Sequence, residues 1–167
     1  MKKTLQKVSL IFLFLLAACS AGKDMKTDWF TLHVPNGIAF TESDPAAAVH
    51  ELKTETVRYL AMDQDNAVMI WFVKASPSEI EEVYDMFAVV MNKMELELSE
   101  KKETDPSMVY VYTPVMANGK PLVEQYQLYA VCRDKEESWL VSLTAPYSRI
   151  GDKDKFIKML STIEFAG

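Results

Sequence analysis

Residues 76–94 carry the strongest helical pattern in this chain, and the segments on either side of them alternate between polar and apolar side chains. Apolar residues recur here at spacings of three and four, which places them along one stripe of a helix. Ser76, Pro77 and Glu79 form an S-x-x-E capping box with proline at the first helical position. The stripe is rich in methionine and could form a binding face, but packing in the core is the preferred interpretation.

The alternating segments predict strands joined by short turns. Residues 29–35 alternate in this way, with His33 on the outward face, and Asn118-Gly119 is the strongest hairpin-turn signal. Hairpin-connected strands form antiparallel sheets, so the predicted fold class is α+β, an antiparallel sheet of about six strands flanked by helices. We expect strands at 29–35, 56–62, 68–74, 96–102 (as an exposed edge), 108–113, 122–132 and 139–145, and a second helix at about 152–163.

The first 18 residues have the composition of a secretory signal peptide. Lys2, Lys3 and Lys7 precede a short apolar run at residues 8–16, and small residues follow it. A membrane-spanning helix needs about 20 apolar residues, so this run is too short to be one. We therefore expect residues 1–18 to be removed after export.

The leader ends in L-A-A-C at residues 16–19, which resembles the lipobox of bacterial lipoproteins. The resemblance implies that the Cys19 thiol takes a diacylglycerol, that the chain is cut between Ala18 and Cys19, and that a fatty acid such as palmitate is added to the new N-terminus. Two or three acyl chains make a stable anchor, at about 0.8 kcal/mol for each buried CH₂ group. Residues 19–28 are then expected to form a lipidated tether, and residues 29–167 a single domain.

Removal of the leader makes the chain more acidic. The formal charge changes from −6 to −9, because three lysines and no acidic residue are lost. An acidic domain of this kind is not expected to bind nucleic acid, and anionic lipid surfaces repel it, so the lipid at Cys19 must attach it to the membrane. Ser20 after the cysteine resembles the outer-membrane class of lipoproteins. In a host with two membranes we expect the domain on the outer membrane, facing the periplasm.

The histidines and the second cysteine give little support for catalysis. His33 and His50 are far apart in the sequence and lack a metal-ligand spacing, so a solvated His33 is the preferred interpretation. Cys132 has no partner within the chain once Cys19 is lipidated. We expect it to be a small buried residue on a strand rather than a redox or nucleophilic site.

Asp63, Asp65 and Asn66 place oxygen ligands in one turn. A calcium loop also needs a glycine and a late glutamate, which are missing here, so a hairpin tip explains these residues better. The chain has no glycine-rich phosphate loop and no nucleophile-elbow motif. We therefore predict no metal, no cofactor and no enzyme activity.

The order of elements, with F-T-L-H-V-P-N-G-I near the start and F-I-K-M-L-S-T-I-E-F at the end, resembles the PsbP-like fold. That fold includes the extrinsic oxygen-evolving subunit of photosystem II, a nuclear-import factor that binds a small GTPase, and small bacterial lipoproteins. The resemblance covers about residues 29–165 and implies an αβα sandwich that serves in binding or assembly. It carries over no functional residue, because the family has no shared catalytic motif.

The sequence therefore predicts a membrane-anchored bacterial lipoprotein of the cell envelope, a non-catalytic binding or assembly module with a protein partner. A carrier of a small apolar or lipid ligand remains an alternative, and an envelope hydrolase is a weaker one. Tyrosine and tryptophan are favoured at interface hot spots, and several lie on predicted strands. Among these we take Tyr129, with its neighbour Gln127, as the candidate residues for binding a partner.

Overall fold

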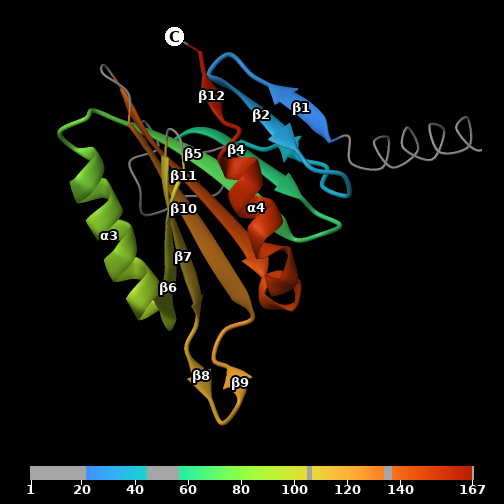
Figure 1. Cartoon of the computed structure of the whole chain (residues 1–167), viewed down its shortest axis with the longest axis vertical. Helices are drawn as coiled ribbons and strands as arrows, with labels where there is room; N and C mark the ends of the chain where they lie inside the picture. Colours follow the sequence, from blue (N-terminus) through green and yellow to red (C-terminus); the bar gives the residue numbers. More distant parts are fainter. Residues whose placement is uncertain (1–21, 45–56, 105–106, 134–136, 167) are drawn as a thin grey trace, which may run out of the picture. The chain divides into compact units, whose positions relative to one another are not determined.

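The computed structural model describes residues 22–44, 57–104, 107–133 and 137–166 (Figure 1). The leader, Cys19, Ser20 and His50 lie outside the described residues. The chain divides into two compact units, and the first combines the N-terminal segment up to Ile38 with the C-terminal segment from Thr162. The second unit runs from Ala39 to Ser161.

The second unit is built on a seven-stranded sheet with the strand order β3-β4-β5-β11-β10-β7-β6. Every neighbouring pair is antiparallel, as the hairpin turns in the sequence predict, and the α+β fold class is confirmed. The strands are β3 (Thr41–Glu42), β4 (Val57–Asp63), β5 (Val68–Ala75), β6 (Leu96–Glu103), β7 (Ser107–Pro114), β10 (Gln125–Arg133) and β11 (Ser138–Pro146).

The pair β10 and β11 forms the centre of this sheet. The two strands pair without interruption from Gln125 opposite Pro146 to Arg133 opposite Ser138. Both strands are buried over almost their whole length, on both faces. Strands that are covered on both faces have nearly continuous apolar sequences. This explains the sequence L-Y-A-V-C in β10 and W-L-V-S-L in β11.

Helix α3 (Ile80–Lys93) lies on one face of the sheet. Half of the predicted capping box is present, because the Ser76 amide donates to the Glu79 carboxylate at 3.3 Å and the Ser76 hydroxyl donates to the same oxygen at 2.6 Å. The Glu79 amide donates to the Ser76 carbonyl instead of the hydroxyl, and the helix begins at Ile80, so the predicted start with Pro77 at the first helical position is wrong. The hydrogen bonds from Ser76 lower the pKa of Glu79. Ile80, Phe87 and Met91 form the buried stripe of the helix, so the preferred interpretation of that stripe as core is confirmed for these positions.

Aromatic rings fill the layer between α3 and the sheet. Phe87 of α3 contacts Trp71 of β5 and Tyr129 of β10, with ring centroids 5.1 and 5.5 Å apart. Tyr84 of α3 packs against Tyr110 of β7 at 4.2 Å. Ring pairs of this kind contribute about 0.5–1.5 kcal/mol each beyond the area they bury. The rings of α3 therefore fix the position of the helix over strands β5, β10 and β7.

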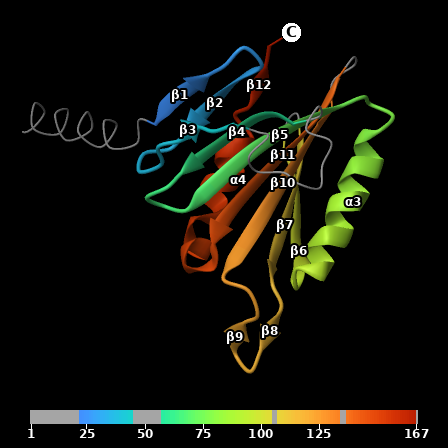
Figure 2. The ribbon, with the colours of Figure 1, turned by 180° about the vertical axis from the view of Figure 1, so that it is seen from behind.

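The opposite face of the sheet carries a 3₁₀ segment, η2 (Tyr147–Asp152), and helix α4 (Lys153–Leu160). Tyr126 of β10 points to that face and donates its hydroxyl to the Arg149 carbonyl at 3.1 Å. Helix α4 buries Phe156, Ile157 and Leu160. The two views in Figures 1 and 2 show α3 and α4 on different sides of the seven-stranded sheet. This arrangement is the predicted αβα sandwich.

A small hairpin continues from the ends of β7 and β10. Strands β8 (Met116–Ala117) and β9 (Lys120–Pro121) pair across Asn118 and Gly119. Both turn residues have positive φ, 52° and 77°, as a type I′ turn requires. Figures 1 and 2 both show this hairpin projecting beyond the rest of the sheet. The predicted turn at Asn118-Gly119 is confirmed.

The first unit is a three-stranded antiparallel sheet in the order β1-β2-β12. Its strands are β1 (Lys23–Lys26), β2 (Phe30–Val34) and β12 (Glu164–Phe165). Phe30, Leu32 and Val34 are buried and His33 is exposed, as the alternation predicts. Strand β1 lies inside the segment expected to be a tether, and the strand at 29–35 belongs to this separate sheet. The local sequence pattern does not predict this sheet, because β2 pairs with both β1 and β12, and β12 lies far from it in the sequence.

Glu95, the second residue after α3, has a left-handed conformation with φ of 59°. A residue with a side chain is strained in that conformation by about 1 kcal/mol relative to glycine. We predict that Glu95→Gly raises the free energy of unfolding by about 1 kcal/mol, measured by urea denaturation followed by circular dichroism. Glu97→Gly is the matched control, because Glu97 lies on the exposed strand β6, where glycine is expected to destabilise. A loss of stability in both variants would contradict the prediction.

Candidate functional site

The two candidate partner-binding residues lie in the core. Gln127 and Tyr129 are both buried on the face of β10 that α3 covers. A protein partner cannot contact side chains that α3 covers, so the structure does not place them on a binding surface. Alternation along β10 predicts which residues share a face, but it does not show that α3 covers that face.

Their polar atoms satisfy each other. The Tyr129 hydroxyl donates to Oε1 of Gln127 at 2.6 Å, and it lies 3.5 Å from Sδ of Met91. Burial raises the pKa of the Tyr129 phenol. A neutral phenol that already donates its proton is a positioned structural group, so it does not act as a nucleophile or base at neutral pH.

A second pair of hydroxyls links the helix to the sheet. The hydroxyls of Tyr84 and Tyr112 lie 2.7 Å apart. Burial raises the pKa of Tyr84 and keeps this phenol protonated, and the hydrogen bond to Tyr112 adds to the effect. The rings of Tyr112 and Tyr129 meet edge to face at 5.8 Å. These side chains occupy the layer beneath α3, so in this part of the domain side chains, and not a ligand, fill the space between helix and sheet.

Cys132 and His33 have the environments that the sequence analysis expected. Cys132 is a free, buried thiol on β10, and burial raises its pKa to about 12, with a hydrogen bond to Ser107 partly offsetting the rise. His33 lies on the exposed face of β2, where its Nδ1 is 2.8 Å from the Asp24 carboxylate. The two side chains therefore lack what nucleophilic catalysis requires, namely a thiolate or a base beside a nucleophile.

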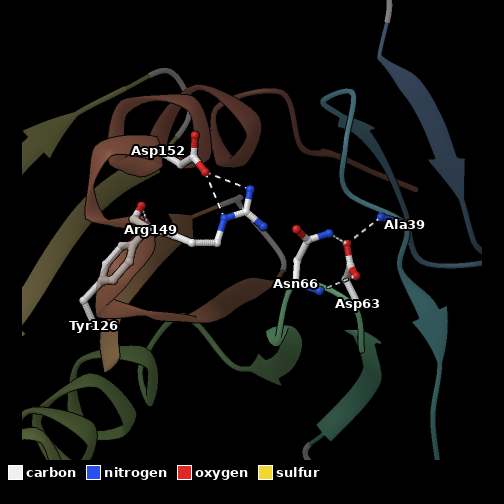
Figure 3. A network of polar contacts seen from close by, with 6 residues as sticks. All are labelled: Ala39, Asp63, Asn66, Tyr126, Arg149 and Asp152. Carbon is white, nitrogen blue, oxygen red and sulfur yellow. Dashed lines mark hydrogen bonds and ion pairs between the residues drawn. The ribbon is translucent and has the colours of Figure 1, made fainter. Parts of the chain in front are cut away.

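Asp63 holds the turn between β4 and β5 in place (Figure 3). Its carboxylate accepts hydrogen bonds from the Ala39 amide at 2.8 Å, the Asn66 amide at 3.0 Å and the Asn66 side chain at 2.7 Å. The carboxylate thus joins the start of the second unit to a hairpin turn. The residues considered as calcium ligands form a hairpin tip, because Asp63 and Asn66 bond to each other and to the backbone.

The pKa of Asp63 is lowered. Burial alone would raise it, but the hydrogen bonds from Ala39 and Asn66 and the nearby charge of Arg149 outweigh that effect. Arg149 itself donates to the Asp152 carboxylate through Nε at 2.9 Å and Nη2 at 2.8 Å, and Figure 3 shows its guanidinium between Asp152 and Asn66. This network is suited to holding η2 and the turn together.

In the parts of the chain that the structure describes, we find no group of three or more His, Cys, Asp or Glu side chains that could hold a metal ion. The same residues include no helix long and apolar enough to cross a membrane.

The hairpin formed by β8 and β9, together with Leu122, is the surface that sequence reasoning missed. Met116 and Leu122 are 49% and 46% exposed, and Lys120 beside them is also exposed. Residues 113–123 contain no acidic side chain, although the whole chain is acidic. Both apolar side chains therefore lie on a projecting, weakly basic hairpin. The absence of acids from this stretch was the signal that could have found it.

We predict that Asp63→Asn lowers the free energy of unfolding by about 2 kcal/mol at pH 7, because hydrogen bonds to a buried charged group are lost. Asp63 has a lowered pKa in the folded state, so its contribution is present above the ordinary carboxyl pKa of about 4 and disappears as the pH falls through the lower folded value. Urea denaturation should therefore show the difference shrinking below about pH 4. The control is Asp65→Asn in the same turn, where the side chain is exposed and the change should be small at every pH.

We predict that Cys132 in the folded protein reacts with iodoacetamide at pH 8 on the order of 1000-fold more slowly than in urea, because only the thiolate reacts and little of it forms. The reaction is followed by the mass of the peptide that contains Cys132. Raising the pH toward the raised pKa should speed the folded-state reaction. Equal rates with and without urea would show that the thiol is accessible and the prediction is wrong.

Comparison with family models and with curated proteins finds no match. Solved structures do match. The solution structure of cyanobacterial PsbP (CyanoP) from Synechocystis sp. PCC 6803 aligns with a TM-score of 0.58 and 17% identity over 87% of this chain and 94% of that chain. A mutant of the protein Mog1 aligns with a TM-score of 0.52 and 13% identity, over 86% of this chain and 95% of that one. At these identities the likeness shows the fold alone, and the chain has the PsbP-like fold.

Proposed function

We propose that this protein is a lipid-anchored, non-catalytic binding or assembly module of the bacterial cell envelope. The lipobox at Cys19 supports the anchor and the location, on the outer membrane facing the periplasm where the host has two membranes. The hairpin of β8 and β9 is the observation that supports binding. Together with Leu122, it places two apolar side chains in solvent beside the single charge of Lys120.

The chemistry of the hairpin indicates its partner. Met116 and Leu122 are about half exposed, so each offers about 1 kcal/mol when a partner buries the rest of it. Methionine is also adaptable in shape, which suits a recognition surface. Lys120 is the one charged residue in residues 113–123. The surface that fits this hairpin is an apolar pocket on an envelope protein with an acidic side chain at its rim.

The described residues favour binding over catalysis. Cys132 is buried with a raised pKa, and His33 is paired with Asp24 on the outer face of β2. The buried phenols of Tyr84 and Tyr129 are held neutral. A hydrolase needs a nucleophile and a base within reach of each other, and these residues do not provide that pair.

A carrier of a small apolar ligand receives less support. A carrier of this kind would hold its ligand between sheet and helix, and there the rings of Trp71, Phe87, Tyr129 and Tyr112 contact one another in series. A ligand would have to displace these contacts. We therefore place recognition on the outside of the domain.

A crosslinking experiment tests this proposal. The full-length protein carries a photoreactive amino acid at Lys120 and is crosslinked in its own membranes. We predict one specific crosslinked envelope protein, and a loss of at least about 10-fold in its yield when Met116→Ser and Leu122→Ser are combined, because about 1.4 kcal/mol of lost burial is a factor of ten. The yield is measured by quantitative mass spectrometry.

Helix α3 supplies the matched control. Met86 and Val89 on its outer side are 44% and 53% exposed, so Met86→Ser with Val89→Ser removes similar apolar surface elsewhere. If this control abolishes the crosslink and the hairpin variant does not, the binding surface is α3 and the assignment to the hairpin is wrong. Cys19→Ala should release the protein from the membrane fraction; if the variant stays there, the proposed anchor is wrong.

A further inference from the structure

The first strand begins very close to the proposed anchor. Gly22 is the first described residue and β1 starts at Lys23, and two residues of sequence, Ser20 and Ala21, lie between Cys19 and Gly22. Three Cα–Cα steps span at most about 11 Å. A lipid on Cys19 would therefore hold this hairpin close to the bilayer surface, with far less freedom than a tether over residues 19–28 would give.

Gly22, the third residue after Cys19, is closely packed. A Cβ atom at this position would lie 2.3 Å from the Val34 carbonyl oxygen and 2.6 Å from Nε2 of His33. The backbone of Gly22 is thus packed directly on the end of β2, and only glycine fits. This close approach leaves Gly22 little freedom to act as a flexible linker.

The turn of the same hairpin presents a tryptophan. The Thr27 hydroxyl accepts hydrogen bonds from the Trp29 and Phe30 amides at 3.1 Å each, and the Thr27 amide donates to the Phe30 carbonyl at 3.0 Å. Asp28 and Trp29 therefore form a tight turn. The Trp29 side chain is 40% exposed, and it is the one exposed large apolar side chain among the described residues of the first unit.

Charge distinguishes the two units. The described residues of the first unit carry two lysines against three acidic residues, whereas residues 39–161 carry 13 basic against 21 acidic ones. Anionic headgroups therefore repel the charges of the second unit far more than those of the first. Each exposed lysine near an anionic surface contributes about 1 kcal/mol of attraction. One of the three acids, Asp24, is paired with His33 at 2.8 Å, and the lysines of the first unit, Lys23 and Lys26, are exposed.

We infer that the β1–β2 hairpin lies along the membrane surface, with Trp29 in the headgroup layer of the bilayer. Tryptophan favours this layer because its ring is apolar and its N–H is polar. The short connection to Cys19 supplies the proximity and Trp29 supplies the contact. Lys26, which pairs with Thr31 on the face of the hairpin that carries the exposed His33, supplies attraction to anionic lipid. The inference rests on the proposed lipid anchor, and it makes the first unit a membrane-contacting surface.

Fluorescence quenching tests this inference. The full-length protein, processed in a bacterial host, is purified from membranes, and its intact mass shows whether Cys19 is lipidated. It is then placed in vesicles of phosphatidylcholine and phosphatidylglycerol in which part of the phosphatidylcholine carries bromine near the headgroup. We predict that the bromine quenches tryptophan fluorescence, and that Trp29→Phe removes most of that quenching.

Trp139→Phe is the matched control, because Trp139 is buried and its loss should leave the quenching in place. Equal quenching in the Trp29→Phe variant and the unaltered protein, or no quenching of a lipidated protein, would overturn the inference while the proposed anchor stands. If the mass shows no lipid, the proposed anchor fails. Cys19 is then coupled to a maleimide lipid, which the buried Cys132 should not react with, and the same quenching measurement decides the inference separately.

Discussion

The uninterrupted pairing of β10 with β11 is the interaction on which the second unit depends. Nine residue pairs join these strands, and apolar side chains project from both faces of the pair. One face receives the aromatic side chains of α3 and the other faces η2. Both helical layers therefore use the same two strands as their base. A charge introduced at the centre of this ladder would be buried without a partner, which costs several kcal/mol.

Much of this architecture could be predicted because it depends on local patterns. The hydrogen bonds from Ser76 to the Glu79 carboxylate, the glycine turn at Asn118-Gly119 and the alternation in β2 are each set by neighbouring residues, and each is present in the structure. The charged strand β6 lies at the edge of the sheet, as its sequence indicates. Charges on an edge strand also discourage pairing with another chain.

The rest could not be predicted because it depends on distant partners. The K-D-M-K sequence of β1 has no strand signal of its own, and it becomes a strand because β2 offers it hydrogen bonds. Strand β12 is only two residues long. Alternation along β10 puts Gln127 and Tyr129 on the same face, but only the position of α3 shows that they are buried. The exposed Met116 and Leu122 could not be told from core residues by hydrophobicity alone, since apolar residues also occur on surfaces.

The pairing of both chain ends with β2 affects the order in which the protein can fold. Strand β12 reaches β2 near His33, where the His33 amide donates to the Thr162 hydroxyl across 129 residues of sequence. Closing so long a loop carries a large entropic cost, and contacts of high sequence separation form late. A chain that is synthesised from its N-terminus presents β1 and β2 long before β12 emerges. During that interval the edge of β2 that pairs with β12 lacks its partner, and truncation near residue 161 would leave that edge of the N-terminal hairpin unpaired.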